Sequence, residues 1–111
     1  PVIEITTASG RYDYESKYTP GASTHIVPAA LSKECTEAVQ AIAARAFTAC
    51  GCSGAARVDI MLSEEEQPYV IEVNAVPGMT ETSLVPDAAR AVGMEFPELC
   101  EKILTMAGYH R

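Results

Sequence analysis

The sequence lacks any excess of basic residues: eight lysines and arginines stand against 15 aspartates and glutamates, giving a net charge of −7 at pH 7. Such a chain has no basic patch for releasing counterions from a phosphate backbone, so we predict no nucleic-acid partner. No apolar run approaches the ~18 residues of a membrane-spanning helix, and we predict no membrane partner. The sequence also contains no glycine-rich phosphate-binding loop. The chain has 111 residues, of which 48% are hydrophobic, and this length and composition predict one small globular domain.

The four cysteines do not form a known redox or metal-binding pattern. Cys50 and Cys52 are separated by one residue, a spacing that fits neither a C-x-x-C redox motif nor a zinc finger. Unpaired thiols are typical of proteins in a reducing cytosol. We therefore predict free cysteines and a cytoplasmic location.

The most informative stretch is 55–74, which predicts a β-hairpin. Apolar residues alternate with polar ones in both halves, and the acidic segment 64–67 predicts a four-residue turn between them. Successive side chains of a strand point to opposite faces, so this turn sets which residues share a face. The apolar pairs on one face would then be Leu62 with Tyr69, Ile60 with Ile71, and Val58 with Val73.

The same register places four polar side chains on the opposite face of the hairpin. Arg57 would lie opposite Asn74, and Asp59 opposite Glu72. Cross-strand neighbours have Cβ atoms only ~5 Å apart, so the two carboxylates would repel and need a compensating positive charge. A divalent cation is one candidate, because Mg²⁺ prefers hard oxygen ligands such as these carboxylates and an amide carbonyl. The alternative is a solvated sheet face with ordinary charges.

Three helices are predicted along the chain. Ser32 is a good N-cap for the first and Gly51 a good terminator, and the small alanines between them predict close packing against the apolar face of the hairpin. Thr82 or Ser83 would cap a second helix, and a third would begin near Pro97. The first helix is scaffold and is assigned no chemistry, whereas the free N–H groups and partial positive charge at the start of the second favour a bound carboxylate.

Two short strands are predicted near the start of the chain, at 1–5 and 24–27, with a long loop at 6–23 between them. A loop of this length inside a compact domain is usually functional or disordered. His25 and His110 have no evident partners in the pattern, and we predict that both lie on the surface.

Four segments of the chain are distinctive: Y-D-Y-E-S-K-Y, R-V-D-I-M, I-E-V-N-A-V-P-G and M-T-E-T-S-L. Together they resemble the C-terminal signature of D-alanine–D-alanine ligases, which belong to the ATP-grasp superfamily. The resemblance covers nearly the whole chain. The sequence departs from the family at Ala75, where Thr or Ser is usual, and at Cys50, where an aliphatic residue is usual.

The resemblance implies an α/β (α+β) fold: the C-terminal half of an ATP-grasp domain, mainly an antiparallel sheet with a β-hairpin packed against three helices. Residues 1–111 would form a single subdomain, with a lid loop at 6–23, the metal-binding hairpin at 55–74 and a substrate loop at 75–84. In the family, a substrate-binding domain and the first half of the ATP-grasp fold precede this region. The chain is therefore expected to be the last third of an enzyme, inactive without its N-terminal portion.

The hairpin residues would carry the phosphate chemistry implied by the resemblance. Asp59, Glu72 and Asn74 match the family's ligands for two Mg²⁺ ions, with Mn²⁺ a possible substitute, and these ions bridge the phosphates of ATP. Arg57 matches the residue that stabilises charge on the transferring phosphoryl group and on the reaction intermediate.

The lid and the substrate loop would complete the site. By resemblance, Lys17 reaches the ATP phosphates and Tyr18 shapes the pocket for the second amino acid. The amide of Gly78 would help to hold the oxyanion, Ser83 would bind the carboxylate of the second D-alanine, and Leu84 would lie beside it.

The activity implied is ATP-dependent formation of the D-alanyl-D-alanine dipeptide for bacterial peptidoglycan, through an acyl phosphate. The substrates would be ATP and D-alanine, and the full-length enzyme would be a homodimer. Three alternatives remain open. They are another ATP-grasp carboxylate–amine ligase, a non-enzymatic cation-binding or interaction module, and a hydrolase that uses the carboxylate pair.

Overall fold

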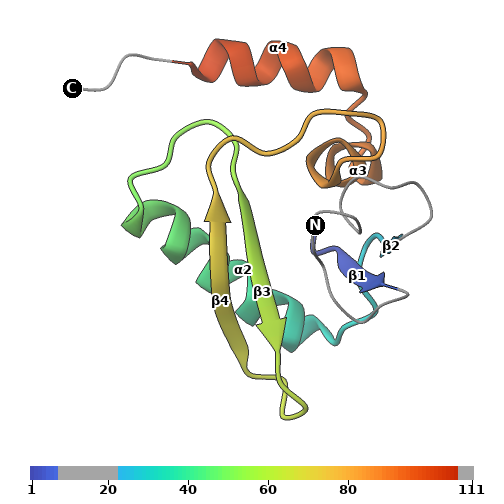
Figure 1. Ribbon diagram of the computed structural model, residues 1–111, viewed down its shortest axis with the longest axis vertical. Coiled ribbons are helices and arrows are strands. Elements are labelled where there is room, and N and C mark those ends of the chain that lie inside the picture. The colour runs from blue at the N-terminus through green and yellow to red at the C-terminus, as the bar shows by residue number, and fades with distance from the viewer. Residues whose placement is uncertain (8–22, 108–111) are drawn as a thin grey trace.

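A computed structural model describes residues 1–7 and 23–107 of the chain. In chain order, its elements are β1 (Glu4–Thr7), β2 (Ser23–Ile26), α2 (Lys33–Ala49), β3 (Arg57–Leu62), β4 (Pro68–Asn74), α3 (Leu84–Ala91) and α4 (Phe96–Met106) (Figure 1). Most of the predicted lid loop, with Lys17 and Tyr18, lies outside the described residues, as does His110.

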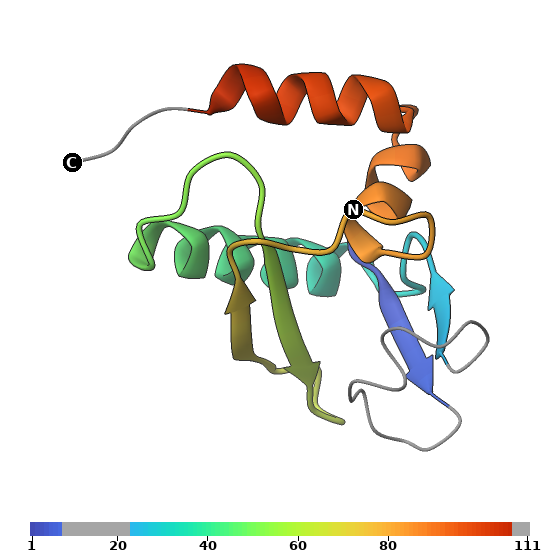
Figure 2. The same ribbon diagram turned by 45° about the horizontal axis from the view of Figure 1, so that its top comes forward.

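The strands form two separate antiparallel sheets of two strands each, β1 with β2 and β3 with β4. Helix α2 packs against both strands of the β3–β4 hairpin, while α3 and α4 pack against each other. The β1–β2 pair lies beside α3, and α4 runs across one end of the molecule (Figures 1 and 2). The mixed α/β architecture with antiparallel sheets and three helices is as predicted. The hairpin, however, packs mainly against one helix instead of three.

Helix α2 begins and ends at the predicted residues. The Ser32 hydroxyl accepts a hydrogen bond from the Cys35 backbone N–H at 3.1 Å, which satisfies one of the free amides of the first turn. Gly51 follows the helix with φ of 68°, the left-handed conformation that glycine adopts at little cost. Cys35 and Val39 are the buried residues of this helix, and they anchor it beneath the hairpin.

The two C-terminal helices form a second small apolar cluster. Leu84 and Ala89 of α3 and Leu99 of α4 are buried, and Pro86 is the largest fully buried side chain among the described residues. Within the part of the chain that the structure describes, no helix is long and apolar enough to cross a membrane.

The hairpin register differs from the predicted one near the turn. A β-bulge between Asp59 and Ile60 leaves Ile71 without a direct partner, and the turn closes with a hydrogen bond from the Ser63 N–H to the Gln67 carbonyl at 3.0 Å. The pairs near the turn are therefore Ile60 with Val70, Met61 with Tyr69, and Leu62 with Pro68.

The bulge also corrects the predicted apolar face. An extra residue reverses the alternation of side chains across it, so Tyr69 and Ile71 do not join the face that contacts α2. Both are largely exposed, at 61% and 63%. Val58 and Val73 do pair as predicted.

Candidate functional site

The polar end of the hairpin has the predicted pairing. Arg57 is the cross-strand partner of Asn74, and Asp59 is the partner of Glu72. Directly opposed residues of an antiparallel pair project from the same face of the sheet. The structure therefore brings the two carboxylates, the guanidinium and the amide together on one face, as the sequence predicted.

Arg57 and Asp59 form a two-point ion pair along β3. Arg57 Nε donates to Asp59 Oδ1 at 2.7 Å, and Nη2 donates to Oδ2 at 3.0 Å. The two side chains are only 16% and 19% exposed, and parallel N–H···O bonds of this kind are strong and directional. The protein itself thus supplies positive charge beside the carboxylate pair. Repulsion between the two carboxylates therefore does not by itself require a cation here.

The donors present nevertheless fit a magnesium ion. Glu72 is exposed and forms no ion pair with any residue in 1–7 or 23–107, so its oxygens face solvent. The Asn74 carbonyl Oδ1 accepts a hydrogen bond from the Val76 N–H at 3.1 Å, which fixes its orientation and leaves a second lone pair. The described residues contain no group of three His, Cys, Asp or Glu side chains placed to hold a metal. Mg²⁺ commonly uses only one or two carboxylates, the remainder being waters and phosphates.

The loop between β4 and α3 is organised around Ser83. Its hydroxyl oxygen accepts a hydrogen bond from the Thr80 backbone N–H at 3.0 Å and lies 2.7 Å from the Thr80 hydroxyl. Ser83 occupies the N-cap position of α3, but its side chain forms no capping bond there. The hydroxyl is directed to the preceding loop, while the first amides of α3 receive no bond from it.

Position 78 requires glycine because a neighbouring side chain lies too close for a Cβ atom, and not because of the backbone angle φ. Among the described glycines, those with positive φ are Gly51, Gly54 and Gly93, so Gly78 lies outside the left-handed region. A Cβ atom at this position would meet Ser83 Oγ at 2.8 Å, closer than real side chains approach. Gly78 thus lets the loop pass directly over the Ser83 hydroxyl.

Leu84 lies beside Ser83 in sequence but belongs to the core. Its side chain is 5% exposed. Leu84 therefore anchors the first turn of α3 beneath the loop. A ligand bound next to Ser83 would approach Leu84 from the loop side.

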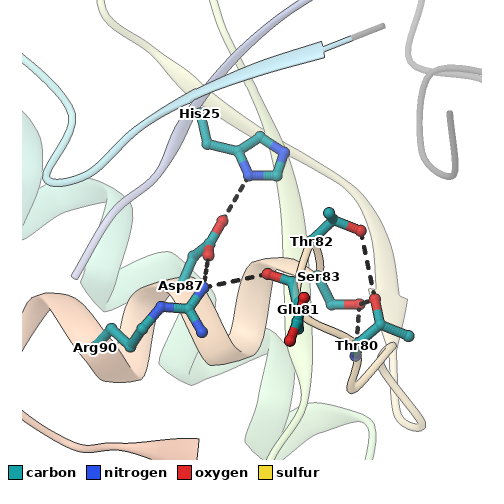
Figure 3. Close-up of polar contacts among 7 residues, drawn as sticks. All are labelled: His25, Thr80, Glu81, Thr82, Ser83, Asp87 and Arg90. Carbon is teal, nitrogen blue, oxygen red and sulfur yellow. Dashed lines mark hydrogen bonds and ion pairs between the residues drawn. The ribbon is translucent and has the colours of Figure 1, made fainter. Parts of the chain in front are cut away.

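A polar cluster that the sequence did not predict lies next to this loop. His25 Nδ1 of β2 lies 2.7 Å from Asp87 Oδ2 of α3, and Arg90 hydrogen-bonds Asp87 (Figure 3). The prediction of a partnerless surface His25 is therefore wrong, and its side chain is 17% exposed. Asp87 and Arg90 have the i, i+3 spacing of a helical ion pair, which was a usable signal. No sequence signal indicated the long-range partner of His25, because this pairing depends on how β2 packs against α3.

Comparison with known proteins identifies the family. The family model described as "D-ala D-ala ligase C-terminus" matches residues 1–105. The chain belongs to this family. The resemblance read from the four sequence segments is thereby confirmed.

Individual relatives agree with that assignment. The chain is 52% identical over 107 residues to the D-alanine–D-alanine ligase of Moorella thermoacetica, covering 96% of this chain and 35% of the relative. It is 55% identical over 107 residues to the ligase of Methylacidiphilum infernorum, with the same two coverages. The crystal structure of the Bacillus anthracis ligase complexed with ATP superposes with a TM-score of 0.77 at 37% identity, covering 96% of this chain and 34% of that one. The chain thus spans about a third of the length of these ligases.

The cysteines of this ligase domain are free, as predicted. Cys35 is buried, whereas Cys50 and Cys100 are exposed. Burial raises the pKa of the Cys35 thiol, and the Glu66 carboxylate raises it further. A thiol with a raised pKa is a poor nucleophile, so Cys35 belongs to the packing beneath the hairpin.

Proposed function

We propose that this chain is the C-terminal, phosphate-handling part of an ATP-dependent D-alanine–D-alanine ligase. The complete enzyme would join two D-alanine molecules through an acyl phosphate for peptidoglycan synthesis in the bacterial cytoplasm, and would act as a homodimer. The observation that carries the proposal is the cross-strand pairing of Asp59 with Glu72 and of Arg57 with Asn74, in a chain of this family.

The polar face of the hairpin would bind the triphosphate of ATP. Asp59, Glu72 and the Asn74 carbonyl would hold Mg²⁺, or Mn²⁺ in its place. The bound metal would neutralise phosphate charge, which is most of what phosphoryl transfer requires of a protein. The two-point contact with Asp59 holds the Arg57 guanidinium beside these ligands, where it would stabilise charge that develops on the transferred group.

The loop before α3 would receive the acceptor D-alanine. A helix N-terminus carries partial positive charge and free N–H groups, which favour a carboxylate. Ser83 stands at that terminus with its hydroxyl held by Thr80, and Gly78 passes within contact distance of it. We assign the acceptor carboxylate to Ser83 and the oxyanion contact to the Gly78 amide, with Leu84 supporting them from below. Lys17 and Tyr18 would complete the site from the lid.

The decisive test is the activity of the full reading frame that contains these 111 codons. The purified product should release ADP only when D-alanine and Mg²⁺ are both present, and the 111-residue chain alone should release none. A product that forms ADP with other amino or hydroxy acids but not with D-alanine would identify a different ATP-grasp ligase. A product with no nucleotide dependence would leave only a binding module.

A variant pair tests the role of the hairpin within that enzyme. Arg57→Gln should lower kcat by ~100-fold or more, as expected when a donor to developing charge is lost. Arg45→Gln is the matched control, because Arg45 lies exposed on α2, away from the polar face of the hairpin. Equal activity of the two variants would remove Arg57 from the proposed mechanism.

A further inference from the structure

A continuous set of polar contacts connects strand β2 to the loop that precedes α3. His25 Nδ1 lies 2.7 Å from Asp87 Oδ2, and the other Asp87 carboxylate oxygen accepts a hydrogen bond from Arg90. Arg90 Nη2 also donates to the backbone carbonyl of Glu81 at 3.3 Å. The contacts therefore run from one sheet, through α3, into the loop (Figure 3).

The same loop is fixed on its other side by hydroxyl groups. Ser83 Oγ accepts from the Thr80 N–H, and the Thr80 and Thr82 hydroxyl oxygens lie 3.4 Å apart. Figure 3 shows Glu81 between these two sets of contacts, with Arg90 on one side and Thr80 on the other. The position of Ser83 thus depends on contacts from both directions.

The His25–Asp87 contact is less accessible to water than an ordinary surface pair, whereas Arg90, whose side chain is 39% exposed, contacts Asp87 and Glu81 at the surface. The side chains of His25 and Asp87 are 17% and 21% exposed, so both are largely withdrawn from water. Hydrogen bonds to ionised groups are stronger than neutral ones, and partial burial reduces their screening. Arg90 lies in the last turn of α3 and Asp87 in the first, so each charge has the sign that the helix dipole favours.

The Arg90 charge has a second consequence for the N-terminus of α3. An uncompensated Asp87 would place negative charge one turn from Ser83 and would repel an incoming carboxylate. The guanidinium of Arg90 cancels that charge while it holds the Glu81 carbonyl. The positive potential of the helix N-terminus then remains available to a ligand.

We propose that His25, Asp87 and Arg90 are positioning residues that hold the 80–83 loop in the geometry that binds the carboxylate of the acceptor D-alanine. They act through Ser83 and touch no reacting atom. The inference rests on the proposed function and adds to it a set of residues that control acceptor affinity without controlling ATP affinity.

Steady-state kinetics of the full-length enzyme test the proposal. Arg90→Ala should raise KM for the acceptor D-alanine about tenfold, equivalent to ~1.4 kcal/mol. Asp87→Ala should raise it less, because removing this carboxylate also removes the negative charge one turn from Ser83. The values of kcat and of KM for ATP should stay within about twofold of the parent enzyme. Residues with a merely structural role would instead lower the folded fraction, which reduces kcat per total protein and leaves KM unchanged.

Conservative variants and controls make the test independent of folding. His25→Asn keeps a donor near the position of Nδ1 and should retain most of the acceptor affinity that His25→Ala loses. Arg45→Ala and Glu98→Gln change exposed charges on α2 and α4 and should alter neither KM. The Asp87→Ala/Arg90→Ala double variant should cost less than the sum of the single variants, because the residues act in one network.

Two outcomes would overturn the proposal. One is an unchanged KM for the acceptor in the Asp87 and Arg90 variants, and the other is an equal rise in KM for ATP. A parent enzyme without D-alanine-dependent activity would instead refute the proposed function, so the two failures are distinguishable.

Discussion

Replacing Gly78 by alanine isolates the contact that shapes the loop before α3. The new Cβ would stand 2.8 Å from Ser83 Oγ but 3.5 Å from Ser83 Cβ, an ordinary contact distance. The Ser83 hydroxyl must therefore rotate away, and it loses its bonds to the Thr80 N–H and hydroxyl. Two neutral hydrogen bonds at ~1 kcal/mol each give a cost of ~2 kcal/mol. The lower entropy of the unfolded alanine chain offsets ~0.4–1 kcal/mol, which leaves a net loss of ~1–1.5 kcal/mol.

A double-mutant cycle measures that cost by urea denaturation of the chain. In a Ser83→Ala background the oxygen is absent, so Gly78→Ala should become neutral or stabilising by up to ~1 kcal/mol. Gly93→Ala is the matched control: Gly93 has φ of 86° and no atom within 4 Å of a built Cβ, so its cost of ~1 kcal/mol is backbone strain alone. That cost should be the same in both backgrounds. An equal cost of Gly78→Ala in the two backgrounds would refute the argument that Gly78 exists to clear the Ser83 hydroxyl.

Four further predictions concern the hairpin, α2 and the cysteines. In the full-length enzyme, Asp59→Asn or Glu72→Gln should raise the Mg²⁺ concentration for half-maximal activity at least about tenfold, measured at fixed ATP. Ser32→Ala should lower the free energy of unfolding by ~1 kcal/mol in urea denaturation, because α2 loses its N-cap. Native Cys35 should react with iodoacetamide more slowly than Cys100. Mass spectrometry of the labelled chain measures both rates, and faster labelling of Cys35 would contradict the prediction. Because the folded state holds the Cys35 proton more tightly, the free energy of unfolding should fall as pH rises above the ordinary thiol pKa of 9.0.

Local sequence signals predicted the elements whose ends depend on local chemistry. Helix α2 begins after Ser32 and ends before Gly51, because an N-cap hydroxyl and a left-handed glycine act within a few residues of their position. The family of the chain was equally accessible, since the segments that carry it are contiguous. Of the two predicted N-cap candidates, Thr82 and Ser83, the structure has Ser83 at the start of α3, but its hydroxyl bonds to Thr80 and not to the helix. A serine hydroxyl can accept a hydrogen bond from the amides of the helix or from a loop amide, and the conformation of the folded loop determines which bond forms.

Contacts between distant elements were not predictable in the same way. His25 meets Asp87 across 62 residues of sequence, and no periodicity in either segment encodes that meeting. The charge compensation of Asp59 by Arg57 was missed for a different reason. The two residues are two apart on one strand and are predicted to share a face, but in the sequence-based prediction the arginine is assigned to phosphate and a cation to the carboxylates. The bidentate bond shows that the Arg57 guanidinium itself compensates the charge of the Asp59 carboxylate.

The bulge at Ile71 explains why the polar pairing was predicted correctly from an incorrect turn. The observed turn pairs Leu62 with Pro68, and strict alternation from there would place Glu72 opposite Val58, on the face that contacts α2. One extra residue in β4 shifts the pairing by one, so that Glu72 meets Asp59 instead. The predicted turn was offset from the real one by the same single residue, and the two errors cancelled. The site therefore depends on the bulge. With the bulge, the end of the hairpin near the turn pairs Leu62 with Pro68, while Asp59 and Glu72 still lie opposite each other on one face.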